Sequence, residues 1–466
     1  MREYVERRMR LLARVIMPLN RVGVKLDRDL QRELIADHRA RLKSWRKRVD
    51  QHFRDHDLGE PPLGLKDGFS YKRMCELLYG KLKLDERHHA STAQVTTNRD
   101  ALKALAKYDR TGTVSLLIER SELKTAEVGI QIKPDADGRV RSRFVLGGDE
   151  KSDQNEAGKE SPGTGRLASR DPNLQNQHEW VRMLYVPTHP EGWIAKADYN
   201  QIEMRLIAHF SGDEVLAEAL KEDAHMFILW KVDGITDLYG VAKRGWRKLL
   251  EGYRAGDPEL EEMRHLQKRI NYGWPYRMGA KKLENVKGVP YQIGKRALEA
   301  LNTIFRRVPE WWDSLVREAR ASAGGSEWGC LTLPFGRRRH FLLDDVPAIC
   351  NFKPTGTAAE ILDDAMEILV PETPRRFPGT QVILTVHDEL VFDVHPSTDV
   401  ERLVAWVREV MERPVPELGG LAIPVEFKIG RNWAKKHTCR DAACAEPPNP
   451  EGAVKLGEWR RERCKR

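Results

Sequence analysis

Two short stretches of the sequence place carboxylates where apolar β-strands are expected to end. Asp198 closes the run "WIAKADY", while Asp388 and Glu389 follow "QVILTVH" and precede the apolar "LVFDV". Two aspartates at strand ends can jointly hold two divalent cations about 3.5–4 Å apart, an arrangement that serves phosphoryl transfer. Such cations would neutralise charges that an apolar sheet tolerates badly. If either aspartate stood alone, a capping role without a metal would be the better interpretation.

A third stretch, "RHLQKRINYGWPYRMGAKKL" at 264–283, carries Arg264, Lys268, Tyr272 and Tyr276 at every fourth position. On a helix, each step of four residues drifts by only about 40°, so the four side chains are predicted to form one slowly winding stripe. A guanidinium and an ammonium one turn apart can clamp a triphosphate, and an aromatic ring can stack on a base or sugar. An Arg–Lys pair alone would be more typical of an amphipathic helix with a solvated basic edge.

The elements that must position these residues are predicted from the spacing of apolar residues. The pattern predicts a strand over 192–200 followed by a helix over 201–210, and a hairpin over 381–394 with 387–389 at its turn. Residues 221–320 are predicted to be mostly helical, with a charged insertion at 243–262. The polar, Gly-rich stretch 146–165 is the clearest boundary.

Composition narrows the class of protein. The chain has 466 residues with 79 basic and 70 acidic side chains, a net charge of +9 that weakly favours a polyanionic partner. Its six cysteines form no CxxC pair, so neither a zinc site nor a disulfide framework is indicated. Arginines interrupt the apolar residues at the N-terminus, so it lacks the apolar core of a signal peptide. No apolar run reaches the length needed to span a membrane. We therefore expect no membrane partner and a cytoplasmic location, in the bacterial host if the gene is phage-encoded.

Six stretches together resemble one known family. "DYNQIEMRLIAHFSGD", "RHLQKRINYGWPYRMG" and "VHDEL" are similar to motifs A, B and C of the family A DNA polymerases, the class of bacterial DNA polymerase I and many phage enzymes. "TGRLASRDPNLQN", "PTGTAAEIL" and "VEFKIGRNW" resemble flanking family segments, and all six occur in family order between 164 and 433. "LARVIMPLNRVGVKLD" resembles the start of the family's thumb.

The resemblance implies a mixed α+β fold, the right-hand polymerase architecture with a palm sheet, helical fingers and a helical thumb. Its implied divisions are 1–160 for the thumb and N-terminal part, 161–220 for the first palm part, 221–345 for the fingers, 346–436 for the second palm part, and 437–466 for a basic C-terminal tail.

The resemblance also implies roles for individual residues. The catalytic set would be Asp198, Asp388, Glu389 and Lys268, the last of these also a proton donor to pyrophosphate. Two Mg²⁺ ions, replaceable by Mn²⁺, would be held by Asp198, Asp388 and the backbone carbonyl of Tyr199. The dNTP would contact Arg264, Lys268, Tyr272, Glu203, Gln201 and His225. Primer-template DNA would contact Arg166, Gln175, Tyr276 and His387.

Two of these roles concern the sugar of the nucleotide. Glu203 is expected to pack against Tyr272 and to block a ribose 2′-OH, and Tyr272 is expected to favour dideoxynucleotides. An exposed helix position is the alternative for Glu203, and a surface helix position is the alternative for His225.

The implied activity is template-directed DNA synthesis in phage-type replication or repair, with dNTPs added to a primer 3′-OH and pyrophosphate released. Nothing precedes the thumb-like segment, so no proofreading or 5′ nuclease domain is expected, and a separate proofreading or processivity factor is a candidate partner. A single-subunit RNA polymerase is the enzymatic alternative, against which Glu203 argues. The other alternative is a catalytically silent DNA-binding accessory protein. The presence of Asp198, Asp388, Arg264 and Lys268 argues against it.

The sequence also departs from the family pattern. Pro275 is expected to kink the nucleotide-binding helix, because proline removes a backbone donor and clashes with the preceding turn. Arg277 replaces a glycine common in the family, and Thr355 replaces a glutamine. The segment 337–350 is shorter than usual, and its "GRRRHF" could supply substitute phosphate contacts.

Overall fold

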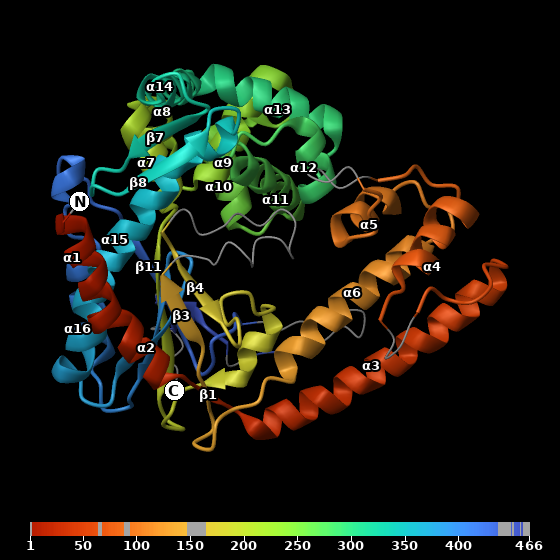
Figure 1. The fold of residues 1–466 in the computed structure, drawn as a ribbon, viewed down its shortest axis with the longest axis horizontal. Coiled ribbons are helices and arrows are strands. Elements are labelled where there is room, and N and C mark those ends of the chain that lie inside the picture. Colours follow the sequence, from red (N-terminus) through yellow and green to blue (C-terminus); the bar gives the residue numbers. More distant parts are fainter. Residues whose placement is uncertain are drawn as a thin grey trace.

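The computed structural model describes residues 2–63, 68–87, 94–146, 165–436, 449, 452–456 and 458–459 of the chain. Helices and strands are mixed, as expected, around a sheet, with one group of helices above the sheet and two long helices projecting from it (Figure 1). Apart from its two end residues, the predicted boundary at 146–165 lies outside the described residues. No helix in the described part of the chain combines the length and apolarity needed to cross a membrane.

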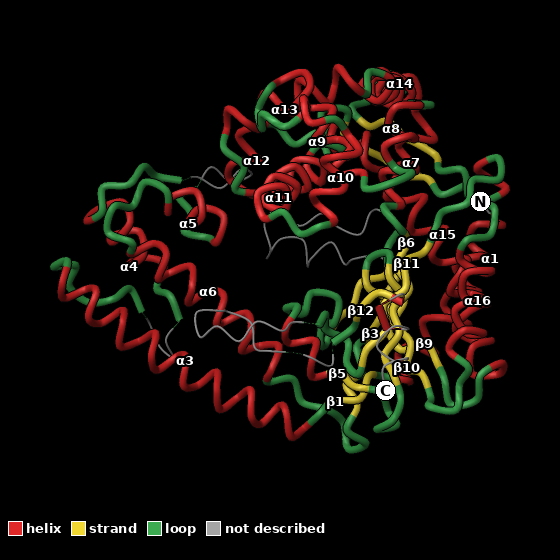
Figure 2. Tube along the Cα trace, turned by 180° about the vertical axis from the view of Figure 1, so that it is seen from behind, coloured by secondary structure: helices red, strands yellow, loops and turns green. Residues whose placement is uncertain are grey.

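The central sheet is a five-stranded antiparallel sheet with the strand order β12-β11-β6-β10-β9. Its middle strand is buried along most of its length. Helices α15 and α16 cover the face of the sheet that lies away from the two long projecting helices (Figure 2). The bounds are β6 Trp193–Tyr199, β9 Gln381–Val386, β10 Glu389–Val394, β11 Val425–Gly430, β12 Val454–Lys455, α15 Val346–Arg376 and α16 Val400–Met411.

The helical layer above the sheet, which we call the fingers, has two apolar clusters of its own and includes α7 and α8 from the stretch expected as the first palm part. The charged insertion predicted at 243–262 folds into α10 and the start of α11, where the Asp257 carboxylate caps α11 by accepting from the backbone N–H groups of Glu259 and Leu260. The bounds are α7 Ile202–Ser211, α8 Glu214–Ala219, α9 Ala224–Thr236, α10 Trp246–Arg254, α11 Pro258–Gly273, α12 Ala280–Lys287, α13 Tyr291–Ile304, α14 Arg307–Ser322, β7 Trp328–Thr332 and β8 Arg338–Leu342.

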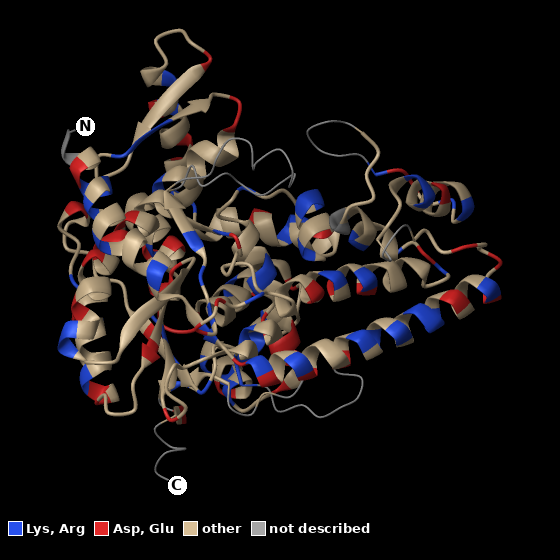
Figure 3. Ribbon diagram, turned by 60° about the horizontal axis from the view of Figure 1, so that its bottom comes forward, with Lys and Arg blue, Asp and Glu red and all other residues tan. Residues whose placement is uncertain are grey.

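The N-terminal part carries the two long helices α3 and α6, which pack on each other around a separate apolar cluster. Lys and Arg follow much of the length of α3, the lower of the two long helices (Figure 3). The bounds are α1 Arg2–Leu11, α2 Met17–Val22, β1 Val24–Leu26, α3 Arg28–Asp55, α4 Tyr71–Cys75, α5 Arg99–Ala106, α6 Thr113–Ile130, β2 Arg139–Val140, β3 Arg143–Leu146, β4 Leu167–Arg170 and β5 Tyr185–Val186.

The first helix is tied to the palm by buried ion pairs. Arg7 Nε lies 3.2 Å from Glu360 on α15, and Arg8 donates to the Asp363 carboxylate at 2.6 Å. Both acceptor side chains are almost fully buried, so removing Arg8 would take from Asp363 its ion-pair partner in the interior.

The segment expected to be a basic tail, 437–466, contributes to the palm in its described residues. Val454 and Lys455 form the edge strand β12, and the Trp459 ring packs against Trp193 at 5.5 Å between centroids. Val454 and Trp459 are buried in the core of the central sheet. The prediction of a tail is wrong for these residues, because a few apolar side chains within a charged stretch suffice to dock it.

The expected kink at Pro275 is also wrong. Helix α11 ends at Gly273, so Pro275 lies in the following turn and interrupts no helix. Tyr276 therefore does not continue the stripe formed by Arg264, Lys268 and Tyr272. Arg277 adopts φ 50°, a left-handed conformation that favours glycine, which explains why a glycine suits this position.

Candidate active site

A cavity of about 820 Å³ collects nearly all of the predicted site residues from the central sheet and the fingers. It is lined by the strand-end carboxylates, by the cations of α11, and by residues of α7 and of the start of α9. Gln175 is the predicted site residue that does not line it. The predicted residues in its wall are Arg166, Asp198, Tyr199, Gln201, Glu203, His225, Arg264, Lys268, Tyr272, Tyr276, His387, Asp388 and Glu389.

The two key aspartates are brought together by strand pairing. In the antiparallel ladder of β6 and β10, Glu389 lies opposite Asp198, and the backbone N–H of Tyr199 donates to the backbone carbonyl of Asp388 at 3.2 Å. The turn before β10 contains His387 in a left-handed conformation with φ 55°, so the predicted hairpin turn is confirmed.

The electrostatics of this carboxylate group favour a bound cation. Burial, reinforced by the nearby Glu389, raises the pKa of Asp198 to about 7. A divalent cation would relieve this repulsion and keep the carboxylate ionised. The described residues contain no cluster of three or more His, Cys, Asp or Glu side chains able to hold a metal. Two carboxylates and a carbonyl nevertheless fit Mg²⁺, because that ion completes its shell with water and substrate phosphates.

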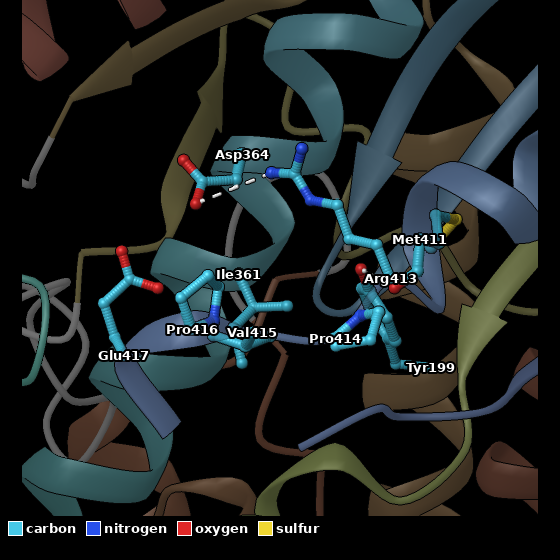
Figure 4. A pocket seen from close by; sticks show the side chains of 9 residues that line it. All are labelled: Tyr199, Ile361, Asp364, Met411, Arg413, Pro414, Val415, Pro416 and Glu417. Atoms are coloured by element: carbon cyan, nitrogen blue, oxygen red, sulfur yellow. Dashed lines mark hydrogen bonds and ion pairs between the residues drawn. The ribbon is translucent and has the colours of Figure 1, made fainter. Parts of the chain in front are cut away.

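Tyr199 reaches this site only through its main chain. Its side chain extends behind the sheet, where the hydroxyl donates to the Met411 carbonyl at 2.9 Å. There it lines a second cavity of about 300 Å³ near the Asp364–Arg413 ion pair (Figure 4). This orientation anchors the backbone at Tyr199, whose carbonyl is the expected metal ligand.

Arg166 joins the carboxylate site to the predicted sugar-selecting residue. Its Nη2 donates to Asp388 Oδ1 at 2.7 Å and to Glu203 Oε1 at 2.8 Å. The guanidinium thus neutralises Asp388 in this structure, and a metal ligand role for that oxygen requires the contact to open.

Glu203 is hydrogen-bonded to Tyr276, a partner that was not predicted. The Tyr276 hydroxyl donates to Glu203 Oε2 at 2.5 Å, which the turn after α11 makes possible. Burial is the main cause that raises the pKa of Glu203. Tyr272 remains half exposed, with its ring 5.7 Å from that of His225.

The cations of α11 face the same cavity. Asp223 accepts a bidentate pair from Arg264 at 2.8 and 3.1 Å, and the Lys268 ammonium lies 5.7 Å from the Tyr272 ring centroid. Burial and the neighbouring Arg264 lower the pKa of Lys268. Asp223 was not predicted, although its place directly before the "AHMF" helix start is a typical capping position, and it caps α9.

His225 is buried, so the alternative of a surface position is wrong. Its Nδ1 accepts from the Asn271 amide at 3.0 Å, and burial lowers the pKa of the ring to about 4. The imidazole is therefore neutral and leaves its Nε2–H for another acceptor.

The two predicted glutamines differ in their surroundings. The side-chain amide of Gln175 bonds to the backbone of Leu167, Ser169 and Thr385 at 3.1 Å in each case, so it joins β4 to β9. Gln201 precedes α7 with φ 51°, and its buried Oε1 has no hydrogen-bond partner within the described part of the chain. Gln175 joins strands beside the site, whereas Gln201 itself lines the cavity.

The chain is similar to DNA polymerases both by a family model and by individual relatives. The model of the family described as DNA polymerase family A matches residues 67–435. The thermostable DNA polymerase I of Thermus aquaticus is 29% identical over 459 residues, covering 91% of this chain and 47% of that protein. DNA polymerase I of Bacillus subtilis (strain 168) is 27% identical over 449 residues, covering 91% of this chain and 44% of that protein. The chain thus spans less than half the length of these curated relatives.

The fold is also similar to that of a solved structure. The polymerase domain of Pol1 from M. smegmatis, in complex with DNA primer-template and dNTP, superimposes with a TM-score of 0.70. The identity is 23%, and the match covers 91% of this chain and 70% of that one. At this level of identity the likeness shows the fold alone.

Proposed function

Because this chain belongs to DNA polymerase family A, we propose that it adds dNTPs to a primer 3′-OH under the direction of a DNA template and releases pyrophosphate. The observation that carries the proposal is the single cavity in which Asp198 and Asp388 of the sheet face Arg264 and Lys268 of α11. Phosphoryl transfer needs this combination of negative and positive groups, because catalysis rests mostly on positioning and electrostatics.

Asp198, Asp388 and the Tyr199 carbonyl are the groups that would hold two divalent cations, Mg²⁺ or Mn²⁺. When bound, the cations supply charge neutralisation at the attacking and leaving oxygens. The raised pKa of Asp198 supports this assignment, since Glu389 and burial leave that carboxylate in need of a counter-charge.

The α11 side chains are proposed to bind the triphosphate of the dNTP. Arg264 is held by Asp223, and a phosphate competes with this carboxylate for the same guanidinium edge. Lys268 has a lowered pKa, which suits it to donate a proton to the leaving pyrophosphate. Neutral His225 can donate one hydrogen bond to a phosphate oxygen through Nε2.

Primer-template DNA is the proposed macromolecular partner. The solved relative with the similar fold holds DNA primer-template and dNTP, and the Lys and Arg side chains of α3 provide charge that attracts a phosphate backbone (Figure 3). Arg166, His387 and Tyr276 line the cavity on the side of Asp388 and Glu203, where a primer terminus must approach. The relatives named above are DNA polymerase I proteins, and we therefore propose a role in DNA replication or repair.

A primer-extension reaction tests the proposal. The chain, a primed DNA template and Mg²⁺ are incubated with either dNTPs or rNTPs, and product length is followed with time. Extension with dNTPs is expected. Extension with rNTPs alone would support the RNA polymerase alternative, and no metal-dependent extension would support the accessory protein.

A further inference from the structure

The edge strand β12 brings one more cation to the active-site cavity. Lys455 lines this cavity together with Asp198, Arg264 and Lys268, although its segment lies outside the residues 67–435 matched by the family model. In the sheet, Glu426 lies opposite Asp198 and Lys455 lies opposite Lys428. Since Glu426 and Lys428 are two residues apart on β11, all four side chains lie on one face of the sheet.

The position of Lys455 is fixed by a tightly built junction. A Cβ on Gly430 would lie 2.5 Å from the backbone nitrogen of Ala453, so the two strands approach closely only because this residue is glycine. Buried Asn432 and Asn449 exchange hydrogen bonds of 2.8 and 3.0 Å between their side-chain amides. The edge strand is therefore a built part of the palm.

The cavity wall around Lys455 pairs lysines with carboxylates, and Asp198 and Glu389 act on Lys428 in addition to Glu426. Lys455 Nζ lies 2.5 Å and Lys428 Nζ 2.9 Å from the carboxylate of Glu426, so two ammonium groups share one acidic partner. The Lys455 side chain is 70% exposed. An exposed ion pair contributes little to stability, so Lys455 can exchange Glu426 for another anion at little cost.

This edge of the palm faces the cations of α11. Lys428 and Lys435 both contribute, after burial and Arg264, to the lowered pKa of Lys268, which places them within electrostatic range across the cavity. A polyphosphate held by Arg264 and Lys268 would thus meet two further ammonium groups, those of Lys428 and Lys455, among the carboxylates on its palm side.

We propose that Lys455, supported by Lys428, binds the polyphosphate of the incoming nucleotide from the palm side, opposite Arg264 and Lys268. The inference rests on the proposed polymerase function and assigns a further nucleotide-binding residue to it. The chemistry requires only that a multiply charged anion enter the cavity and replace Glu426 as the partner of the Lys455 ammonium.

The test compares Lys455→Gln with Lys221→Gln as a matched control. Lys221 is 69% exposed and lies 2.5 Å from Glu218, so it offers the same kind of surface ion pair but does not line the cavity. Three quantities are measured: the Kd of the next correct dNTP in a complex with dideoxy-terminated primer, the inhibition constant of inorganic pyrophosphate, and the Kd of primer-template.

We expect Lys455→Gln to weaken dNTP and pyrophosphate binding by about three- to tenfold, the loss of one charge-assisted contact, with primer-template binding unchanged. Lys221→Gln should leave all three quantities as in the parent, and Lys455→Arg should restore most of the lost affinity. Unchanged dNTP and pyrophosphate binding in Lys455→Gln, in a parent that extends primers, would overturn the inference. Weakened primer-template binding with normal pyrophosphate inhibition would also overturn it, because Lys455 would then contact DNA. A parent without extension would refute the proposed function instead.

Discussion

Selection against ribonucleotides is predicted to depend on the carboxylate of Glu203, held between Arg166 and Tyr276. For a 2′-OH to enter with Glu203 in place, the carboxylate must leave two hydrogen bonds, at 2.8 Å to Arg166 and 2.5 Å to Tyr276. Each charge-assisted bond is worth about 1.5–3 kcal/mol, and partial exposure of the three groups reduces the sum to about 2–4 kcal/mol. Glu203→Ala removes this barrier, so discrimination should fall by about 30- to 1000-fold.

The assay is single-nucleotide primer extension, in which kcat/KM is measured for a dNTP and for the matching rNTP. The ratio of the two values is the discrimination, and it should fall because the rNTP value rises. Tyr276→Phe keeps the ring but removes one of the two bonds, so the same reasoning gives a smaller loss of about tenfold.

Glu203→Gln is the matched control for size. It keeps a side chain of the same length, whose amide oxygen can accept from Arg166 while its amide nitrogen donates to the Tyr276 oxygen, so discrimination should stay within a few-fold of the parent. Equal discrimination in Glu203→Ala and the parent would refute the steric role of Glu203. A loss in Glu203→Gln as large as that in Glu203→Ala would show that charge, and not occupied space, selects the sugar.

Two other predictions concern the wall formed by α9 and α11. Tyr272→Phe should make chain termination by dideoxynucleotides less efficient, because the hydroxyl of this half-exposed ring is then missing beside the sugar; equal termination in parent and variant would contradict this. His225 has a pKa lowered by burial to about 4, so the unfolded chain takes up its proton first as the pH falls. The free energy of unfolding should therefore fall by about 3 kcal/mol between about pH 6.5 and 4, and be fully present above that range. The free energy of unfolding is measured with denaturant at several pH values for the parent and for His225→Gln. Its fall between about pH 6.5 and 4 should be smaller in the variant by about 3 kcal/mol, and an equal fall in the two proteins would refute the prediction.

Local sequence patterns were sufficient to predict the strands and the turn that carry Asp198, Asp388 and Glu389. The apolar alternation on both sides of His387 predicted a hairpin, and the run before Asp198 predicted a strand, and both elements are present. Antiparallel pairing of these strands then brings Asp198 beside Glu389 without further information.

The errors arose where contacts between distant segments decide the structure. Helical spacing extended the stripe to Tyr276, but α11 stops at Gly273, and the turn carries the Tyr276 hydroxyl to Glu203 on α7. No local signal reveals that Asp223 pairs with Arg264, because the same residue serves as an ordinary helix cap.

The same limit explains the edge strand. Lys455 lies in a charged stretch with few apolar residues, which predicts a solvated tail. Its place in the sheet depends on the close approach allowed by Gly430 and on the ring contact of the nearby Trp459 with Trp193. Gly430 and Trp193 both lie far from Lys455 in sequence.

The most direct test of the central claim is extension by Asp388→Asn, measured together with its affinity for primer-template. Asparagine keeps an oxygen that can accept from Arg166 at the position of Asp388 Oδ1, but it removes the charge needed to hold a divalent cation. We predict that Mg²⁺-dependent primer extension is lost while primer-template Kd stays within a few-fold of the parent. Extension by Asp388→Asn at a rate close to that of the parent would contradict the assignment of Asp198 and Asp388 as the pair that organises phosphoryl transfer.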